Sequence, residues 1–201
     1  MWLKICGMTD LDAVEAALAA RVDAIGFVFS PSVRRLEPAQ AARLAARARD
    51  RAVLVAVTLH AQQPLIDRII RVFKPDALQA DVSDFDRLRL PDTLGRLPVL
   101  RADVAAGGAL PPRFLFEGAR SGSGAAADWD TAARLARASE LILAGGLNAH
   151  NVGAAIRAVR PYGVDVSSGV ESAPGRKSAQ KISEFVEAAR AAGEGMANDA
   201  N

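Results

Sequence analysis

The strongest constraint on this chain is a pattern that repeats along its length: a short apolar run, then a loop, then a stretch with the apolar spacing of a helix. The clearest copy joins "VLVAVTL" to "QPLIDRIIRVF", where Ile66, Ile69, Ile70 and Phe73 have the i, i+3, i+4, i+7 spacing of a helix that buries one side. The apolar runs that predict strands cover residues 2–7, 24–30, 53–59, 76–80, 97–102, 113–118, 141–146 and 162–169.

The stretches behind these runs differ in how strongly they predict a helix. Thr9 or Asp10 can cap the first helix, Pro38 suits the first turn of the second, and Asn148 is the expected N-cap of the seventh. The stretch 84–90 is short, and 103–110 contains two adjacent glycines. We therefore expect shortened fourth and fifth helices.

Strands that alternate with helices predict an α/β fold with a parallel sheet. An open, doubly wound sheet usually has a G-x-G-x-x-G turn after its first strand, and "CGMTD" lacks that spacing. A closed (β/α)₈ TIM barrel fits the eight units and the 201 residues better. No linker divides the chain, so we predict one barrel domain over 1–192 and a polar, disordered C-terminal tail over 193–201.

Composition excludes several classes of function. The formal net charge is only +2, and although the isoelectric point is near 9.0, the arginines are scattered among acidic residues, so no nucleic-acid partner is expected. A single cysteine excludes an internal disulfide framework, and neither a leader peptide nor a membrane span is recognisable. We expect a cytoplasmic protein without a membrane partner. The oligomeric state is left open, with a monomer as the working expectation.

In a barrel of this kind the active site lies at the carboxyl ends of the strands. The candidates that follow the apolar runs are Cys6, Arg34, Glu117, Gly145, Gly146, Asp165, Ser167, Ser168 and Gly169. "AGGLN" places two glycines before an expected helix N-terminus, and "SSG" adds two hydroxyls in the next unit, which together favour a bound phosphate. The competing interpretations are a tight turn at the two glycines and a buried structural thiol at Cys6.

Four segments resemble the phosphoribosylanthranilate isomerase family: "KICGMTD", "DAIGFVFSPS", "LILAGGLN" and "RPYGVDVSSGVESAPGRK". The resemblance spans nearly the whole chain. It implies an Amadori rearrangement in tryptophan biosynthesis, which converts N-(5-phosphoribosyl)anthranilate into 1-(2-carboxyphenylamino)-1-deoxyribulose 5-phosphate. It also implies that the substrate is a small phosphorylated molecule and that no metal or organic cofactor takes part.

The resemblance also assigns roles to residues. Cys6 matches the cysteine that acts as general base, and Glu117 stands where the family has an aspartate as general acid. Arg34, with Arg35 as its competitor, is expected to bind the anthranilate carboxylate, and Asp165 is expected to face the substrate. The phosphate is assigned to Gly145, Gly146, Ser167, Ser168 and Gly169.

This chain departs from the family pattern in three places. Glu117 is one methylene longer than the usual aspartate, and "SGSG" replaces a Gly-Thr-Gly loop that is expected to cover the substrate. After the fourth strand the family reads Gln-Leu-His-Gly, whereas "LQADVSD" has no histidine, and neither His60 nor His150 is an evident replacement. Two alternatives follow: a catalytically silent phosphosugar-binding barrel, or another phosphosugar isomerase such as one of histidine biosynthesis, in which an aspartate would be expected in place of Cys6.

Overall fold

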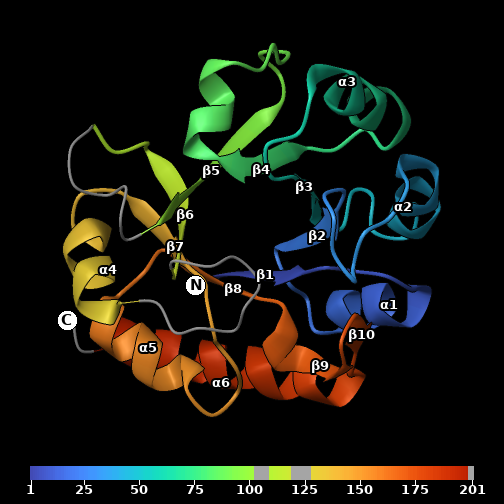
Figure 1. The fold of residues 1–201 in the computed structure, drawn as a ribbon. Helices are drawn as coiled ribbons and strands as arrows, with labels where there is room; N and C mark the ends of the chain where they lie inside the picture. The colour runs from blue at the N-terminus through green and yellow to red at the C-terminus, as the bar shows by residue number, and fades with distance from the viewer. Residues whose placement is uncertain (102–108, 119–127, 199–201) are drawn as a thin grey trace.

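The computed structural model describes residues 1–101, 109–118 and 128–198. Eight parallel strands in these ranges form a closed barrel, in which each strand pairs with its neighbours in sequence and β1 also pairs with β8 (Figure 1). The strands are β1 (Trp2–Cys6), β2 (Ala24–Val28), β3 (Val53–Val57), β4 (Ala77–Asp81), β5 (Gly95–Arg101), β6 (Arg113–Glu117), β7 (Glu140–Leu143) and β8 (Gly163–Val166). The predicted (β/α)₈ architecture is confirmed.

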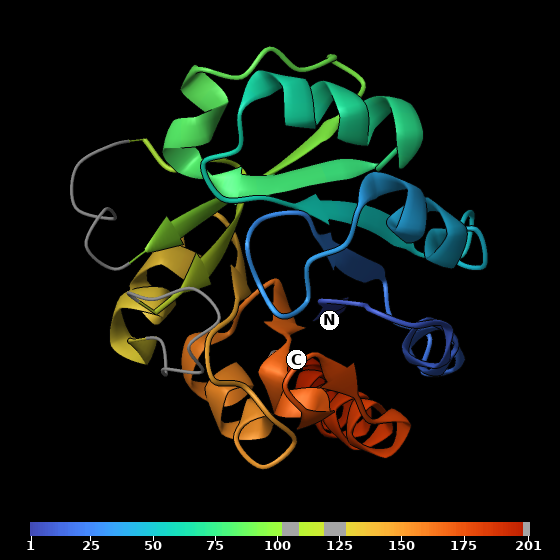
Figure 2. The same cartoon turned by 45° about the vertical axis from the view of Figure 1, so that its right-hand side comes forward.

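Helices surround the barrel and cover its outer wall (Figures 1 and 2). They are α1 (Leu11–Ala19), α2 (Pro38–Ala45), α3 (Gln63–Val72), α4 (Trp129–Ala136), α5 (Val152–Val159) and α6 (Ala179–Asn198). Their starts follow from local chemistry: the Asp10 side chain accepts a hydrogen bond from the Ala13 N–H, and Pro38 occupies the first position of α2.

The fourth and fifth crossovers and the C-terminal helix differ in how they compare with the expected helices. The fourth crossover contains only a single 3₁₀ segment, η1 (Val82–Asp86), as the short stretch after β4 predicted. Of the expected fifth helix, residues 103–108 lie outside the described residues. The expected domain boundary at residue 192 falls inside α6, which continues to Asn198, while 199–201 lie outside the described residues.

The predicted start of the seventh helix is wrong. Asn148 does not cap α5, which begins at Val152 with Asn151 as its N-cap residue. The Asn148 side chain instead accepts hydrogen bonds from the N–H groups of His150 and Asn151. A side chain that bonds the backbone two and three residues ahead stabilises a turn, so the chain makes one more turn before the helix.

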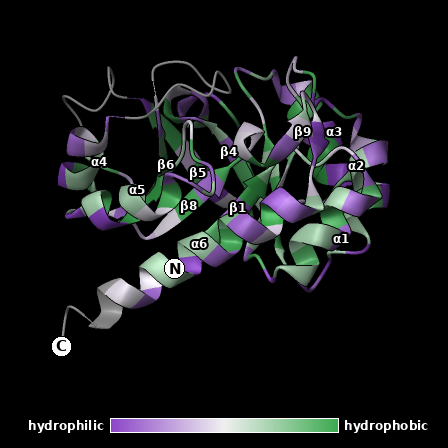
Figure 3. Cartoon of the chain, turned by 90° about the horizontal axis from the view of Figure 1, so that it is seen from below, coloured by the Kyte–Doolittle hydropathy of each residue, from purple (hydrophilic) through white to green (hydrophobic). Residues whose placement is uncertain are grey.

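The strand residues alternate between two apolar regions. Outward-facing side chains such as Leu3, Ile5 and Phe27 pack under the helices in the main core, where Phe73 lies 5.2 Å from Phe27 and 5.3 Å from Phe29 between ring centroids. A smaller apolar cluster that includes Val55, Leu97, Val99, Leu115 and Ile142 fills the barrel interior. Figure 3 shows α6 along one side of the molecule, with hydrophobic and hydrophilic residues alternating along it.

After β8 the chain forms a short 3₁₀ turn, η2 (Ser168–Val170), and a small antiparallel pair, β9 (Glu171–Ala173) and β10 (Arg176–Lys177), before α6 begins. This pair was not expected from the sequence. It brings two charged side chains, Glu171 and Lys177, to the carboxyl ends of the barrel strands. The polar residues described below therefore come from both the strands and this added hairpin.

Candidate active site

A cavity of about 220 Å³ opens at the carboxyl ends of the strands. Its lining includes five of the residues singled out in the sequence: Cys6, Arg34, Glu117, Asp165 and Ser167. They come from β1, β6, β8 and the loops after β2 and β8. Gly145, Gly146, Ser168 and Gly169 are not among the described residues that line it.

Cys6 shares one face of β1 with Lys4, because side chains two residues apart on a strand point the same way. Lys4 is fully buried, and its Nζ donates to Asp165 Oδ1 at 2.7 Å. On β2, Gly26 lies opposite Cys6, and a Cβ at that position would be 2.9 Å from Cys6 Sγ and 3.3 Å from Lys4 Cε. The missing side chain of Gly26 thus leaves the space that the thiol and the lysine occupy.

The charges around Cys6 act in opposite directions. Burial raises the pKa of the Cys6 thiol above its ordinary value, and the nearby Lys4 ammonium opposes that rise. Burial also works against the charge of Lys4, but Asp165 and Cys6 outweigh it, so the pKa of Lys4 is raised and its ammonium persists. The thiol therefore lies in a buried setting that contains a permanent positive charge.

Arg34 is held by Glu171 on the new hairpin. Its Nε and Nη2 donate to the two carboxylate oxygens of Glu171 at 2.5 Å and 2.8 Å, which is the forked geometry that suits a guanidinium. Lys177 Nζ donates to Glu171 Oε1 at 2.9 Å and to the Ser167 carbonyl at 3.0 Å. Burial opposes the charge of Glu171, but Arg34 and Lys177 lower the pKa of its carboxyl to about 2.

Glu117 belongs to a second charged group on the other side of the cavity. Arg101, at the end of β5, donates to Glu117 Oε1 at 3.1 Å and also to Asp81 at the end of β4. Asp81 ends β4 within "LQADVSD", the segment that lacks the histidine of the family motif. Asp81 and Arg101 end strands, and that position alone could have identified them from the sequence.

The segments assigned to the phosphate lie beside one another. Gly145 and Gly146 have φ angles of 90° and 65°, which only glycine adopts readily. A Cβ on Gly169 would lie 1.9 Å from the Leu147 carbonyl oxygen, so the turn after β8 packs directly on the loop after β7. The two glycines do not directly precede a helix, because α5 starts only at Val152.

The two histidines lie elsewhere. His60 pairs through Nδ1 with Asp84 at 3.1 Å and is largely exposed. His150 is exposed in the turn before α5. The "SGSG" segment, which was expected to cover the substrate, lies within 119–127, outside the described residues.

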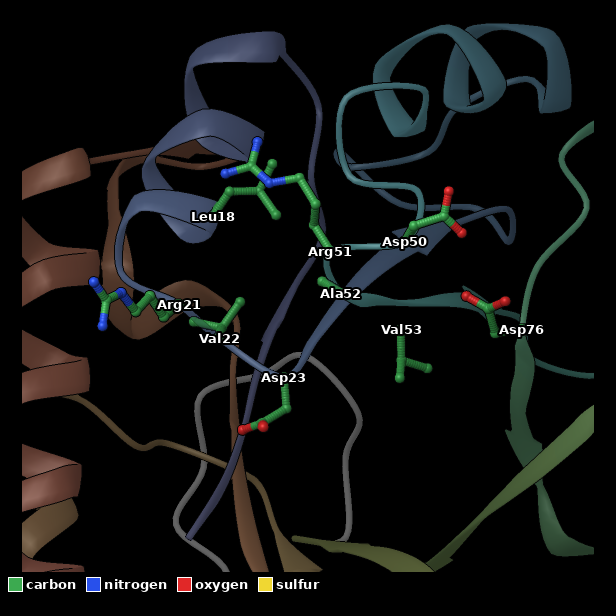
Figure 4. Close-up of a pocket in the computed structure, with 9 residues that line it drawn as sticks. All are labelled: Leu18, Arg21, Val22, Asp23, Asp50, Arg51, Ala52, Val53 and Asp76. Carbon is green, nitrogen blue, oxygen red and sulfur yellow. The ribbon is translucent and has the colours of Figure 1, made fainter.

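A larger hollow of about 730 Å³ opens at the opposite end of the barrel (Figure 4). Two of the aspartates that line it stabilise the fold: Asp23 accepts a hydrogen bond from the Leu3 N–H, and Asp76 accepts one from the Leu54 N–H. These bonds satisfy backbone donors at strand starts. In a barrel of this type the end where strands begin serves stability, so the smaller cavity is the candidate active site.

Within the described ranges, no helix has the length and apolarity needed to cross a membrane. The same residues contain no group of three or more histidine, cysteine, aspartate or glutamate side chains arranged to hold a metal ion.

Comparisons with known proteins agree with this geometry. The family model described as N-(5'-phosphoribosyl)anthranilate (PRA) isomerase matches residues 3–188. The N-(5'-phosphoribosyl)anthranilate isomerase of Mesorhizobium japonicum is 39% identical over 94% of this chain and 95% of its own length. The crystal structure of TrpF from Jonesia denitrificans is 33% identical, has a TM-score of 0.80, and aligns over 96% of this chain and 98% of that one.

A further solved structure is a phosphoribosyl anthranilate isomerase in complex with reduced 1-(o-carboxyphenylamino)-1-deoxyribulose 5-phosphate. It is 25% identical to this chain, has a TM-score of 0.76, and the alignment covers 95% of this chain and 99% of that one.

Proposed function

The chain belongs to the N-(5'-phosphoribosyl)anthranilate isomerase family of tryptophan biosynthesis, and we propose that the cavity formed by Cys6, Arg34, Glu117 and Asp165 is where it carries out this isomerisation. The observation that carries the proposal is the presence of a thiol and a carboxyl group, from the non-adjacent strands β1 and β6, in the lining of one small cavity. An aldose–ketose rearrangement needs two such proton carriers.

The reaction begins with two proton transfers and ends with a tautomerisation. An acid protonates the ring oxygen of the ribose, the bond from C1 to that oxygen breaks, and an iminium forms between C1 and the anthranilate nitrogen. A base then removes the proton from C2, the electron pair of that C–H bond neutralises the iminium, and the enolamine tautomerises to the C2 ketone. We assign Cys6 as the base and Glu117 as the acid.

Arg101 bears on the acid role of Glu117. A guanidinium beside a carboxyl group favours the ionised carboxylate, whereas the acid step needs a protonated one. Asp81 shares the charge of Arg101, and the substrate brings a carboxylate and a phosphate into the cavity. The acid role therefore requires that Glu117 carries a proton once the substrate is bound.

The remaining residues would bind the two ends of the substrate. Arg34 is assigned to the anthranilate carboxylate, with Glu171 fixing the orientation of its guanidinium. The backbone and hydroxyl groups of 145–146 and 167–169 are assigned to the phosphate, next to the buried Lys177. With both ends bound in this way, we expect the reacting carbons to lie between Cys6 and Glu117.

The test is the loss of phosphoribosylanthranilate fluorescence, followed over time with substrate generated in situ. Cys6→Ser and Glu117→Gln should each fold but lose about 10²-fold or more in turnover, the scale of a general base or acid. Glu117→Asp should retain much of the rate, and Glu194→Gln, an exposed exchange on α6, is the matched control.

Near-normal turnover in Cys6→Ser would remove the thiol from the mechanism. An active Gln variant beside an inactive Asp variant would remove Glu117. No turnover in the wild-type protein, despite binding of a reduced product analogue, would support the silent phosphosugar-binding barrel instead.

The setting of the enzyme belongs to the same proposal. We place it in the cytoplasm as one barrel domain that acts as a monomer on a small phosphorylated substrate, without nucleic-acid or membrane partners and without a metal or organic cofactor. Light scattering on the purified protein, with a mass near 21.1 kDa expected, tests the oligomeric state.

A further inference from the structure

We propose that Lys4 is a positioning residue whose ammonium group, held in place by Asp165, stabilises the thiolate of Cys6. The inference deepens the proposed function, because it rests on Cys6 as the general base. It also gives Asp165 a role: this carboxylate acts on the reaction through Lys4.

The placement of Lys4 is fixed by three features of the barrel. Lys4 and Cys6 lie on the same face of β1, two residues apart, and Lys4 stands opposite Asp165 in the register of β1 with β8. The Lys4 side chain is 0% exposed and its Nζ lies 2.7 Å from Asp165 Oδ1. A Cβ built on Gly26 would lie 3.3 Å from Lys4 Cε and 2.9 Å from Cys6 Sγ, so the two side chains lie next to each other over this glycine.

A buried lysine in this position is costly unless it has partners. Taking an ammonium out of water is unfavourable, and one carboxylate pays only part of that cost when it is itself buried. A thiolate two residues along the strand is a second anionic partner for the same ammonium. Lys4 therefore favours the charged form of Cys6 and opposes the effect of burial, through a side chain that is fully buried.

Other charged groups also face Cys6. Asp165 on β8 disfavours its thiolate, Lys177 on β10 favours it, and Arg34 from the loop after β2 lies beside it. Asp81, Arg101 and Glu117 line the far side of the same cavity. Arg34 and Lys177 share the carboxylate of Glu171, and of all these cations Lys4 opposes the effect of burial on the pKa of Cys6 most strongly.

The test titrates the thiol directly. Cys6 is the only cysteine of the chain, so the rate of alkylation by iodoacetamide as a function of pH reports on this residue alone. Lys4→Met should move the titration to higher pH and reduce alkylation at pH 8 by about tenfold or more. Asp165→Asn removes a negative charge near Cys6 and should move the titration of the thiol to lower pH.

Opposite shifts from the two ends of one ion pair are the expected signature of a charge effect. Shifts in the same direction, or no shift with Lys4→Met, would overturn the proposal, since loss of packing would disturb both variants alike. The double variant Lys4→Met/Asp165→Asn removes both charges of the ion pair, so it should fold. Its Cys6 thiol should titrate at a higher pH than the thiol of Asp165→Asn. Lys74→Met, an exposed lysine exchange, is the control and should leave the titration unchanged.

The outcome can be separated from that of the proposed function. If Cys6→Ser keeps full turnover while Lys4→Met shifts the titration, the charge effect stands and the base role fails. If Cys6→Ser is inactive while Lys4→Met leaves the titration unchanged, the base role stands and Lys4 has no part in it. Where both hold, kcat/KM of Lys4→Met should fall at pH 7 and recover as the pH is raised.

Discussion

Glu171 offers the sharpest test of the electrostatics of this barrel. Its carboxylate is 5% exposed and accepts hydrogen bonds from Arg34, Lys177 and the Gly175 N–H. Burial opposes its charge, yet Arg34 and Lys177 lower its pKa from an ordinary 4.5 to about 2. That difference corresponds to about 3 kcal/mol of folding free energy.

The sign of the pH dependence follows from the lowered pKa. The folded state favours the ionised carboxylate, so the stabilisation is complete above pH 4.5 and is lost as the pH falls toward 2. In Glu171→Gln the amide NH₂ faces donors and cannot be ionised. We therefore expect this variant to unfold about 3 kcal/mol more easily at pH 7, with a difference from wild type that shrinks below pH 4.5.

Urea unfolding of both proteins at pH 7, 5, 4 and 3 measures this difference, with Glu194→Gln as an exposed control. A difference that stays constant across this range would refute the ionic argument, because loss of shape or packing does not titrate. Glu171→Gln should also raise KM more than it lowers kcat, because Arg34 loses the paired hydrogen bonds to the carboxylate that orient its guanidinium toward the substrate.

Two further exchanges test the packing around the site. Gly169→Ala puts a Cβ 1.9 Å from the Leu147 carbonyl oxygen, so the turns after β7 and β8 must separate. We expect a lower Tm and a raised KM. An unchanged KM would contradict the placement of the phosphate at these turns. Phe73→Ala removes a fully buried ring that contacts Phe27 and Phe29 outside the barrel wall. This variant should lower the free energy of unfolding, measured with denaturant, by about 3–5 kcal/mol and leave kcat of the folded enzyme near wild type. A large loss of kcat would show that the outer core shapes the cavity.

Local patterns predicted the elements of this fold where one periodicity dominated. The apolar spacing at 63–73 predicted α3, observed at Gln63–Val72, and the strand runs around Cys6 and Glu117 lie where β1 and β6 form. Prediction failed at Asn148, because a side chain that can cap a helix can equally close a turn, and only the loop after β7 selects between them.

For the site, position at or just after the end of a strand identified Cys6, Glu117 and Asp165 as candidates, and the family motif singled out Arg34 in the loop after β2. The structure brings all four to one cavity. Their partners were missed. Lys4 was treated as part of an apolar run. Glu171 and Lys177 lie on a hairpin that no local signal predicted, and they bond Arg34 and Ser167 in the cavity lining.

The sequence by itself determined the alternation of strand and helix, the closure of eight units into a barrel, and the family to which the chain belongs, because these depend on periodicity and motif over short stretches. The tertiary structure alone decided which charges meet. Lys4 and Asp165 are 161 residues apart, and Arg34 and Glu171 are 137 apart, yet each pair shares a hydrogen bond. Barrel closure places β8 beside β1, and the cost of leaving a buried charge unpaired then selects these partners, a constraint that acts through space and leaves no period in the sequence.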